Sequence, residues 1–153
     1  MDPLSFAEAI AGLSPNAPVI GLDLGSKTIG VAISDITRRI ASSMETITRK
    51  KFTEDAKRLL AIAGERQAGL FVLGLPLNMD GSEGPRAQST RAFARNLGRL
   101  TPLPIVFWDE RLTTAAVERM LIDADTSRAR RAEIVDKLAA AYILQSALDS
   151  LKR

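Results

Sequence analysis

Apolar and polar positions along the chain form short runs that predict strands first and helices later. Residues 19–24 and 28–34 are apolar and rich in β-branched side chains, and a short Gly-Ser-Lys segment separates them. This pattern predicts a β-hairpin. Residues 40–50 predict a third strand, although their alternation is weaker. Three consecutive strands imply an antiparallel meander.

Helical spacing of apolar residues begins after this meander. Residues 53–67 predict a helix, with Thr53 as its N-cap. Residues 70–75 are continuously apolar, which is typical of a strand buried on both faces beside a crossover helix. Residues 86–100 predict a second helix whose apolar face includes Leu100.

The last third of the chain predicts a strand over 103–108, a short helix over 113–122, a polar arginine-bearing loop over 123–131 and a long helix over 133–151. This order predicts an α/β fold, in which a mixed five-stranded sheet has three antiparallel strands, then two parallel ones, and helices on its faces. No repeat or linker divides residues 19–153, so they form one predicted domain. Residues 1–18 are a short N-terminal extension, expected to be dispensable.

Two absences from the composition restrict the chemistry. The chain has 153 residues without cysteine or histidine. Thiolate zinc sites, cysteine nucleophiles, histidine-ligated metals and Ser-His-Asp arrangements are therefore excluded. Acid–base chemistry must come from carboxylates, lysine, tyrosine or water bound to a hard metal ion.

Charge and hydropathy indicate where the protein acts and on what. No apolar run reaches the roughly 18 residues of a membrane span, and the N-terminus carries acidic residues where a secretory signal has basic ones. We expect a cytoplasmic protein. A sequence pI near 9.6 and an excess of arginine over lysine favour a phosphate-bearing partner, because guanidinium groups match phosphate oxygens.

Asp23 is the first candidate for chemistry, because aspartate is depleted in strands and a buried carboxylate is unfavourable unless it is paired or metal-bound. Strand alternation places it on the face of Gly21. Gly21 and Gly25 leave room for a ligand on that face, and Gly30 opens the same region from the next strand. The alternative is an edge-strand aspartate that caps the turn at Ser26.

Two further acidic positions are candidates. Asp109 and Glu110 end the last predicted strand, and ligands usually bind at the carboxyl ends of parallel strands. Asp136 lies on the last helix, on a face of small apolar residues that would let the helix bring it against Asp23. The alternatives are ordinary acidic residues in a loop before a helix, and an exposed aspartate favoured by the helix dipole.

Together these carboxylates form an all-oxygen ligand set suited to Mg²⁺ or Mn²⁺. Two such ions can align and neutralise a phosphodiester bond without histidine. Arginines that could follow a phosphate backbone, or could simply be solvated, recur on the second helix and before the last one. They are Arg91, Arg95 and Arg99, and Arg128, Arg130 and Arg131.

Four motifs carry a family resemblance: GLDLGSKTIGVAISD, LFVLGLPLNMDGSEGPRA, WDERLTTAAVERML and VDKLAAAYILQSAL. In this order, over residues 19–148, they resemble the YqgF family, relatives of the RuvC resolvases in the ribonuclease H superfamily. The resemblance implies a ribonuclease-H-like fold and an acidic catalytic and metal-binding set of Asp23, Glu110 and Asp136. The family motif selects Glu110 over Asp109, a choice that strand alternation leaves open.

The resemblance also implies a substrate. The family is described as a nuclease that processes the 5′ end of pre-16S ribosomal RNA, and also as a Holliday junction resolvase. We therefore expect a metal-dependent endonuclease, a monomer or homodimer, acting on structured RNA first and branched DNA second. The candidate substrate contacts are Lys27, Asn78, Arg86, Arg111, Thr113, Arg130 and Arg131.

Two other classes compete with a nuclease. GLDLG followed by a second strand also resembles the phosphate loop of the actin, hexokinase and heat-shock-protein group. Those proteins enclose ATP between two such domains, and one is present here. The other class is a non-catalytic nucleic-acid-binding or ribosome-assembly module, against which the retention of three carboxylates argues.

Overall fold

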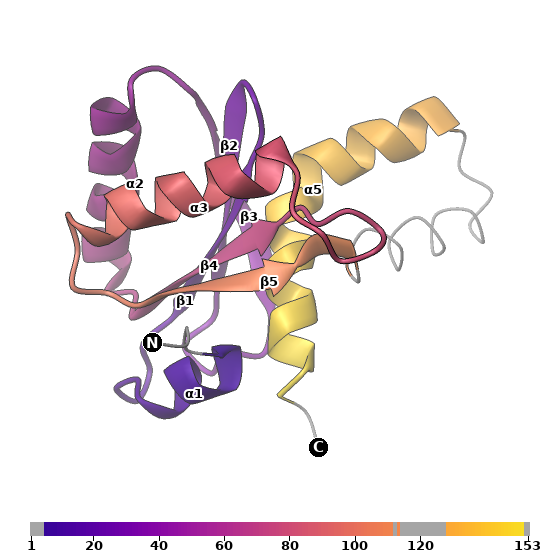
Figure 1. Ribbon diagram of the computed structural model, residues 1–153. Helices are drawn as coiled ribbons and strands as arrows, with labels where there is room; N and C mark the ends of the chain where they lie inside the picture. The colour runs from indigo at the N-terminus through magenta and orange to yellow at the C-terminus, as the bar shows by residue number, and fades with distance from the viewer. Residues whose placement is uncertain (1–4, 112, 114–127, 152–153) are drawn as a thin grey trace.

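The computed structural model describes residues 5–111, 113 and 128–151, and for residues 128–137 it describes the backbone alone (Figure 1). The elements follow the order α1 (Phe6–Ala11), β1 (Val19–Leu24), β2 (Thr28–Ser34), β3 (Ala41–Thr48), α2 (Phe52–Arg66), β4 (Leu70–Leu75), α3 (Pro85–Gly98), β5 (Ile105–Asp109) and α5 (Arg128–Asp149).

The strands form one mixed sheet in the order β3-β2-β1-β4-β5. The β1–β2 and β2–β3 pairs are antiparallel, whereas β1–β4 and β4–β5 are parallel. Asp23 is paired with Gly30 of β2, and Leu22 with Leu73 of β4. The predicted sheet of three antiparallel and two parallel strands is confirmed. Its parallel strands place the ends of β1, β4 and β5 at one edge.

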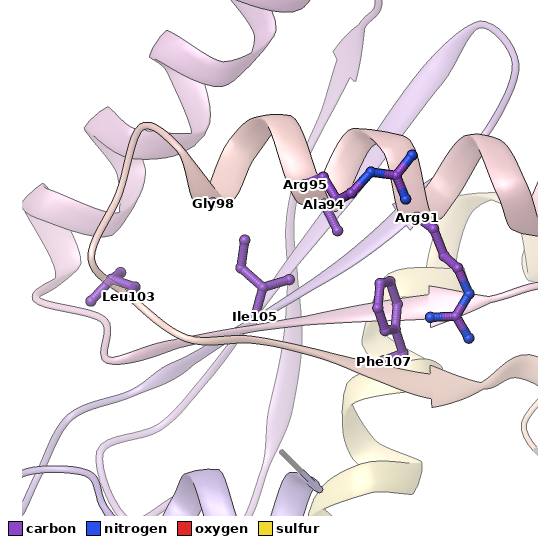
Figure 2. A pocket seen from close by; sticks show the side chains of 7 residues that line it. All are labelled: Arg91, Ala94, Arg95, Gly98, Leu103, Ile105 and Phe107. Carbon is purple, nitrogen blue, oxygen red and sulfur yellow. The ribbon is translucent and has the colours of Figure 1, made fainter. Parts of the chain in front are cut away.

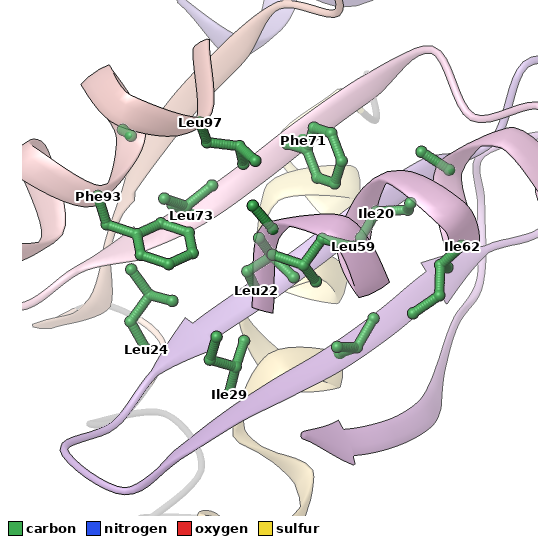
Figure 3. Packing of buried hydrophobic residues seen from close by; sticks show 14 of the residues in the cluster. Ile20, Leu22, Leu24, Ile29, Leu59, Ile62, Phe71, Leu73, Phe93 and Leu97 are labelled. Carbon is green, nitrogen blue, oxygen red and sulfur yellow. The ribbon is translucent and has the colours of Figure 1, made fainter. Parts of the chain in front are cut away.

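Helices cover both faces of the sheet, because alternate residues of each strand point to opposite sides. Ile20, Leu22 and Leu24 pack against α2 and α3, and Figure 3 shows side chains from these three elements meeting in one layer. Val19 and Val72 face the other way, towards α1 and α5. The side chain of Asp23 belongs to this second face.

The boundaries of the two middle helices differ from the predictions. Thr53 is not an N-cap: α2 begins at Phe52 and its N-cap is Lys51. The buried carboxylate of Asp55 accepts the backbone N–H of Lys50 at 3.2 Å and so satisfies the backbone before the helix. The second helix ends at Gly98, which leaves Leu100 52% exposed instead of on the apolar face.

The last strand and helix are also shifted. β5 begins at Ile105, not at 103, because Pro104 lacks an N–H and restricts the residue before it. α5 begins at Arg128 instead of 133, since residues 128–149 contain no proline or glycine. The predicted loop residues 128–131 are therefore helical, whereas 114–127 lie outside the described residues. None of the helices in the described part of the chain is long and apolar enough to cross a membrane.

The N-terminal extension contributes to the core. Ser5 and Glu8 form a reciprocal capping box at the start of α1, which fixes this short helix. Phe6 is buried, and its ring meets that of Trp108 edge-to-face with centroids 6.1 Å apart. The segment that was expected to be dispensable therefore covers part of the sheet beside α5.

Replacing Phe6 with alanine is expected to lower the free energy of unfolding by about 3 kcal/mol, because it leaves a cavity beside Trp108. Urea denaturation followed by circular dichroism measures this loss. Leu100→Ala is the control, since the exposed Leu100 side chain should contribute within about 0.5 kcal/mol. Equal stability of the two variants would show that α1 is peripheral.

Candidate active site

Close approach of α5 to the sheet creates the environment of Asp23. A Cβ on Gly21 would lie only 2.8 Å from Leu144 Cβ and 3.2 Å from Ala140 O. The helix therefore fills the space that the sequence analysis assigned to a ligand, and that interpretation of Gly21 was wrong. At Gly30 a Cβ would be 3.5 Å from Ala140 Cβ and 3.7 Å from Asp23 Cβ, so α5 also lies close to Asp23.

Gly74 leaves space above β4 for other side chains, a feature that the sequence analysis did not identify. A Cβ there would fall 2.6 Å from Glu110 Oε1 and 2.6 Å from Ile143 Cδ1. The Glu110 side chain therefore lies over β4, in the layer between the sheet and α5. The signal in the sequence was a lone glycine inside an apolar strand, which often marks a close approach of another group.

Asp23 and Glu110 meet at the edge where β1, β4 and β5 end. Burial raises the pKa of Glu110 to about 7, aided by the charge of Asp23 and a hydrogen bond between the two side chains. The positive charge of Arg86 acts in the opposite direction. Near neutral pH the pair thus tends to keep one proton. Two adjoining carboxylates are an arrangement that a divalent cation stabilises, because its charge replaces the proton.

This pair predicts a pH dependence of stability in metal-free protein. Between the ordinary pKa of 4.5 and about 7, the folded protein keeps a proton on Glu110 that the unfolded chain releases. The contribution of Glu110 to the free energy of unfolding should therefore be largest below pH 4.5. It should fall as the pH rises towards 7. Thermal melting in chelator at pH 5 and pH 8, for native protein and Glu110→Gln, measures the difference. An unchanged pH dependence in Glu110→Gln would contradict the pairing.

Asp109, the other acidic candidate at the end of β5, forms an ion pair with Arg111. Arg111 donates to both Asp109 carboxylate oxygens, with the shortest contact 2.6 Å from Nη2 to Oδ2, and this keeps the pKa of Asp109 low. Arg111 Nη1 also donates to Met79 O at 3.1 Å. The pair thus ties the end of β5 to the loop after β4. Arg111, predicted to contact substrate, makes these contacts within the protein.

The remaining candidate substrate contacts lie in different settings. Lys27 is exposed in the β1–β2 turn, and Arg86 lies in the first turn of α3. The Asn78 amide donates to Ser82 Oγ at 2.9 Å within the loop after β4. Thr113 is buried, and its hydroxyl has no hydrogen-bond partner among the described residues.

Asp136, Arg130 and Arg131 belong to the first half of α5, where the side chains lie outside the described residues. The backbone of Asp136 is one helical turn before Ala140, the residue that lies against Gly30. The expected placement of the Asp136 side chain against Asp23 therefore stays a prediction.

Arginines on α3 face the β5 edge of the sheet. Arg91 pairs with Glu83 at 2.6 Å, and its guanidinium lies over the Phe107 ring, 4.9 Å from the centroid. Arg91 and Arg95 border a cavity of about 410 Å³ between α3 and β5, shown in Figure 2. The Arg91 guanidinium is thus already paired within the protein. Phosphate binding by Arg91 would have to compete with Glu83.

Oxygen atoms are the donors that the site offers to a metal ion. Within the described residues, no group of three aspartate or glutamate side chains is arranged to hold one. Asp23 and Glu110 supply two carboxylates that already meet. Such hard donors fit Mg²⁺ or Mn²⁺ and not a softer metal.

The mixed sheet and its flanking helices define a protein of the ribonuclease-H-like fold class. Among solved structures, Thermus thermophilus RuvC in complex with a Holliday junction substrate has the same fold, with a TM-score of 0.54 at 11% identity over 88% of this chain and 94% of that one. The chain belongs to the RuvX family, whose model is described as Holliday junction resolvase and matches residues 17–150.

Curated relatives are much closer in sequence. A protein of Nitrobacter winogradskyi is 66% identical over 148 residues, which are 97% of this chain and 91% of the relative. A protein of Cereibacter sphaeroides is 65% identical over 147 residues, 96% of this chain and 92% of the relative. Both carry the name "Putative pre-16S rRNA nuclease".

Proposed function

We propose that this protein is a divalent-metal-dependent endonuclease that processes the 5′ end of precursor 16S ribosomal RNA in the cytoplasm. The observation that carries the proposal is the meeting of Asp23 and Glu110 at the carboxyl edge of the parallel strands. The names of relatives about two-thirds identical along nearly the whole chain support RNA as the substrate.

In this proposal Asp23 and Glu110 are metal ligands, and Asp136 completes the set from α5. Bound Mg²⁺ or Mn²⁺ would supply an activated water and neutralise charge on the phosphate. Asp23 is positioned by β1, whereas Glu110 is positioned by Gly74, which leaves space for its side chain. Asp109 and Arg111 hold the loop after β4 beside this edge. Lys27 and Arg86 are two of the candidate contacts to the substrate backbone.

The second candidate function is cleavage of branched DNA, favoured by the family description and not by any feature of the acidic edge. Paired cuts at a four-way junction need two active sites, so this function requires a dimer. A monomer in solution would favour RNA processing. Size-exclusion chromatography with light scattering distinguishes the two states.

In the deciding experiment, purified protein is mixed with one of two labelled substrates, a precursor 16S RNA fragment or a DNA four-way junction. Each is incubated with Mg²⁺, with Mn²⁺ and with chelator, and the products are separated by electrophoresis. We expect metal-dependent cutting of the RNA. Selective cutting of the junction would support the second candidate. Folded protein that binds but cuts neither substrate would refute the nuclease proposal and support a non-catalytic assembly role.

A further inference from the structure

We propose that a cavity between the β1–β2 turn and α3 binds a backbone phosphate next to the bond that is cut, with Arg49 as its main contact. The inference rests on the proposed nuclease function. The cavity has a volume of about 160 Å³. Gly25 and Ser26 of the turn border it together with Arg49, and Arg86 and Ser89 of α3 border it from the other side. We call it the Arg49 cavity.

Arg49 is held in place by three contacts before any ligand binds. Its backbone N–H donates to Lys27 O at 2.9 Å, and its Nη1 donates to Gly25 O at 2.7 Å. The guanidinium carbon lies 5.7 Å from the centroid of the Phe93 ring. Phe93 is itself buried and packs edge-to-face on Phe52. A guanidinium anchored in this way loses little conformational entropy when it binds a ligand.

Hydrogen-bonding capacity remains on this anchored group. A guanidinium has five N–H donors, and the contact with Gly25 uses one of them. Within the described part of the chain, the Arg49 side chain makes no other hydrogen bond and no ion pair. The fork of donors next to the cavity therefore suits an oxyanion with several acceptor atoms.

The charge of the Arg49 cavity also selects an anion. Arg86 is a second guanidinium, and the hydroxyls of Ser26 and Ser89 are exposed donors beside it. Among the residues that the structure describes, no aspartate or glutamate borders the cavity. Two guanidinium groups with neighbouring hydroxyls match the oxygens of a phosphodiester better than a carboxylate or an apolar ligand.

The cavity lies next to the acidic edge but on the other face of the sheet. Gly25 follows Asp23 by two residues, and the intervening Leu24 points towards α2 and α3. Arg86 connects the two sites, because it borders the cavity while its charge acts on Glu110. A strand that crosses the end of β1 would therefore place one phosphate at the carboxylates and a neighbouring one beside Arg49.

The test compares two arginine substitutions that remove the same charge. Arg49→Ala removes the proposed contact, whereas Arg66→Ala removes an exposed arginine beside Ile33 and Ser34, at the opposite end of β2. Both are made in Asp23→Asn protein, so that binding of the RNA fragment and the four-way junction is measured by fluorescence anisotropy without cutting. Arg49→Ala should weaken binding about tenfold more than Arg66→Ala. The slope of log Kd against log salt should also fall by about one.

A second pair keeps the test valid if Arg49→Ala misfolds. Ser89→Asp places a negative charge in the cavity, and Gln88→Glu places one on the adjacent exposed residue outside it. Binding should be lost in Ser89→Asp and nearly unchanged in Gln88→Glu. Equal binding within both pairs would overturn the inference. The inference would also be overturned if the substitutions lowered the affinity for inorganic phosphate but not for the RNA fragment or the four-way junction. That result would indicate a site for free anions.

Cleavage by the otherwise native chain separates this inference from the proposed function. At protein concentrations below saturation, Arg49→Ala should cut the substrate more slowly than Arg66→Ala, because it binds the substrate more weakly. Absence of cutting by the native chain would refute the nuclease proposal, while the binding comparison would still decide the role of Arg49. If the native chain cuts the substrate and Arg49→Ala binds it as well as Arg66→Ala does, the phosphate site at the Arg49 cavity is refuted. The nuclease proposal then stands.

Discussion

Replacing Asp23 with asparagine is expected to lower the cleavage rate by about 10³-fold or more, equivalent to roughly 4 kcal/mol of transition-state stabilisation. Asparagine has nearly the same shape and still hydrogen-bonds, but it lacks the charge that a metal ligand at this position provides. The fold should persist. The substitution also removes a negative charge that raises the pKa of Glu110, so metal-free protein should be at least as stable as the native chain.

Single-turnover cleavage with Mg²⁺ measures the rate, thermal melting measures the stability, and anisotropy measures binding. Affinity for nucleic acid should change only a few-fold, because most of it comes from contacts to the phosphate backbone. Glu65→Gln is the matched control, since it removes one carboxylate from the exposed end of α2. A native rate in the Asp23→Asn protein would refute the proposed mechanism.

The second large effect is expected from Gly21→Ala, which should destabilise the protein by about 3 kcal/mol. The new methyl group would lie 2.8 Å from Leu144 Cβ and 3.2 Å from Ala140 O. Both atoms are close to the α5 backbone, so a side-chain rotation cannot relieve the overlap and the helix must move away from the sheet. In the proposed nuclease, where α5 supplies a metal ligand, the same movement should also slow cleavage.

Gly64→Ala is the matched control, because it makes the same chemical change at an open position of α2. No atom lies within 4 Å of a Cβ built there. Alanine favours helix over glycine, so this variant should gain about 0.5–1 kcal/mol of stability. Urea denaturation of both variants tests the opposite signs. A stable, fully active Gly21→Ala protein would show that close approach of α5 is not required.

Sequence patterns determined much of the fold. Short apolar runs predicted β1, β2 and β4, and helical spacing predicted α2 and α3, because burial against a sheet or on one helix face imposes these patterns directly on the chain. The errors are at ends of elements, such as Thr53, Leu100 and the start of α5. Ends depend on local capping and on competing backbone hydrogen bonds, which leave weak traces in composition.

The sequence by itself also determined which groups are available for chemistry: no histidine, no cysteine and an aspartate inside a strand. Only the tertiary structure decided how they meet. It joined Glu110 to Asp23 through the space above Gly74, and it paired Asp109 with Arg111. Residues 87 positions apart come together through the pairing of β1, β4 and β5 and the packing of α5, so no local pattern records their contact.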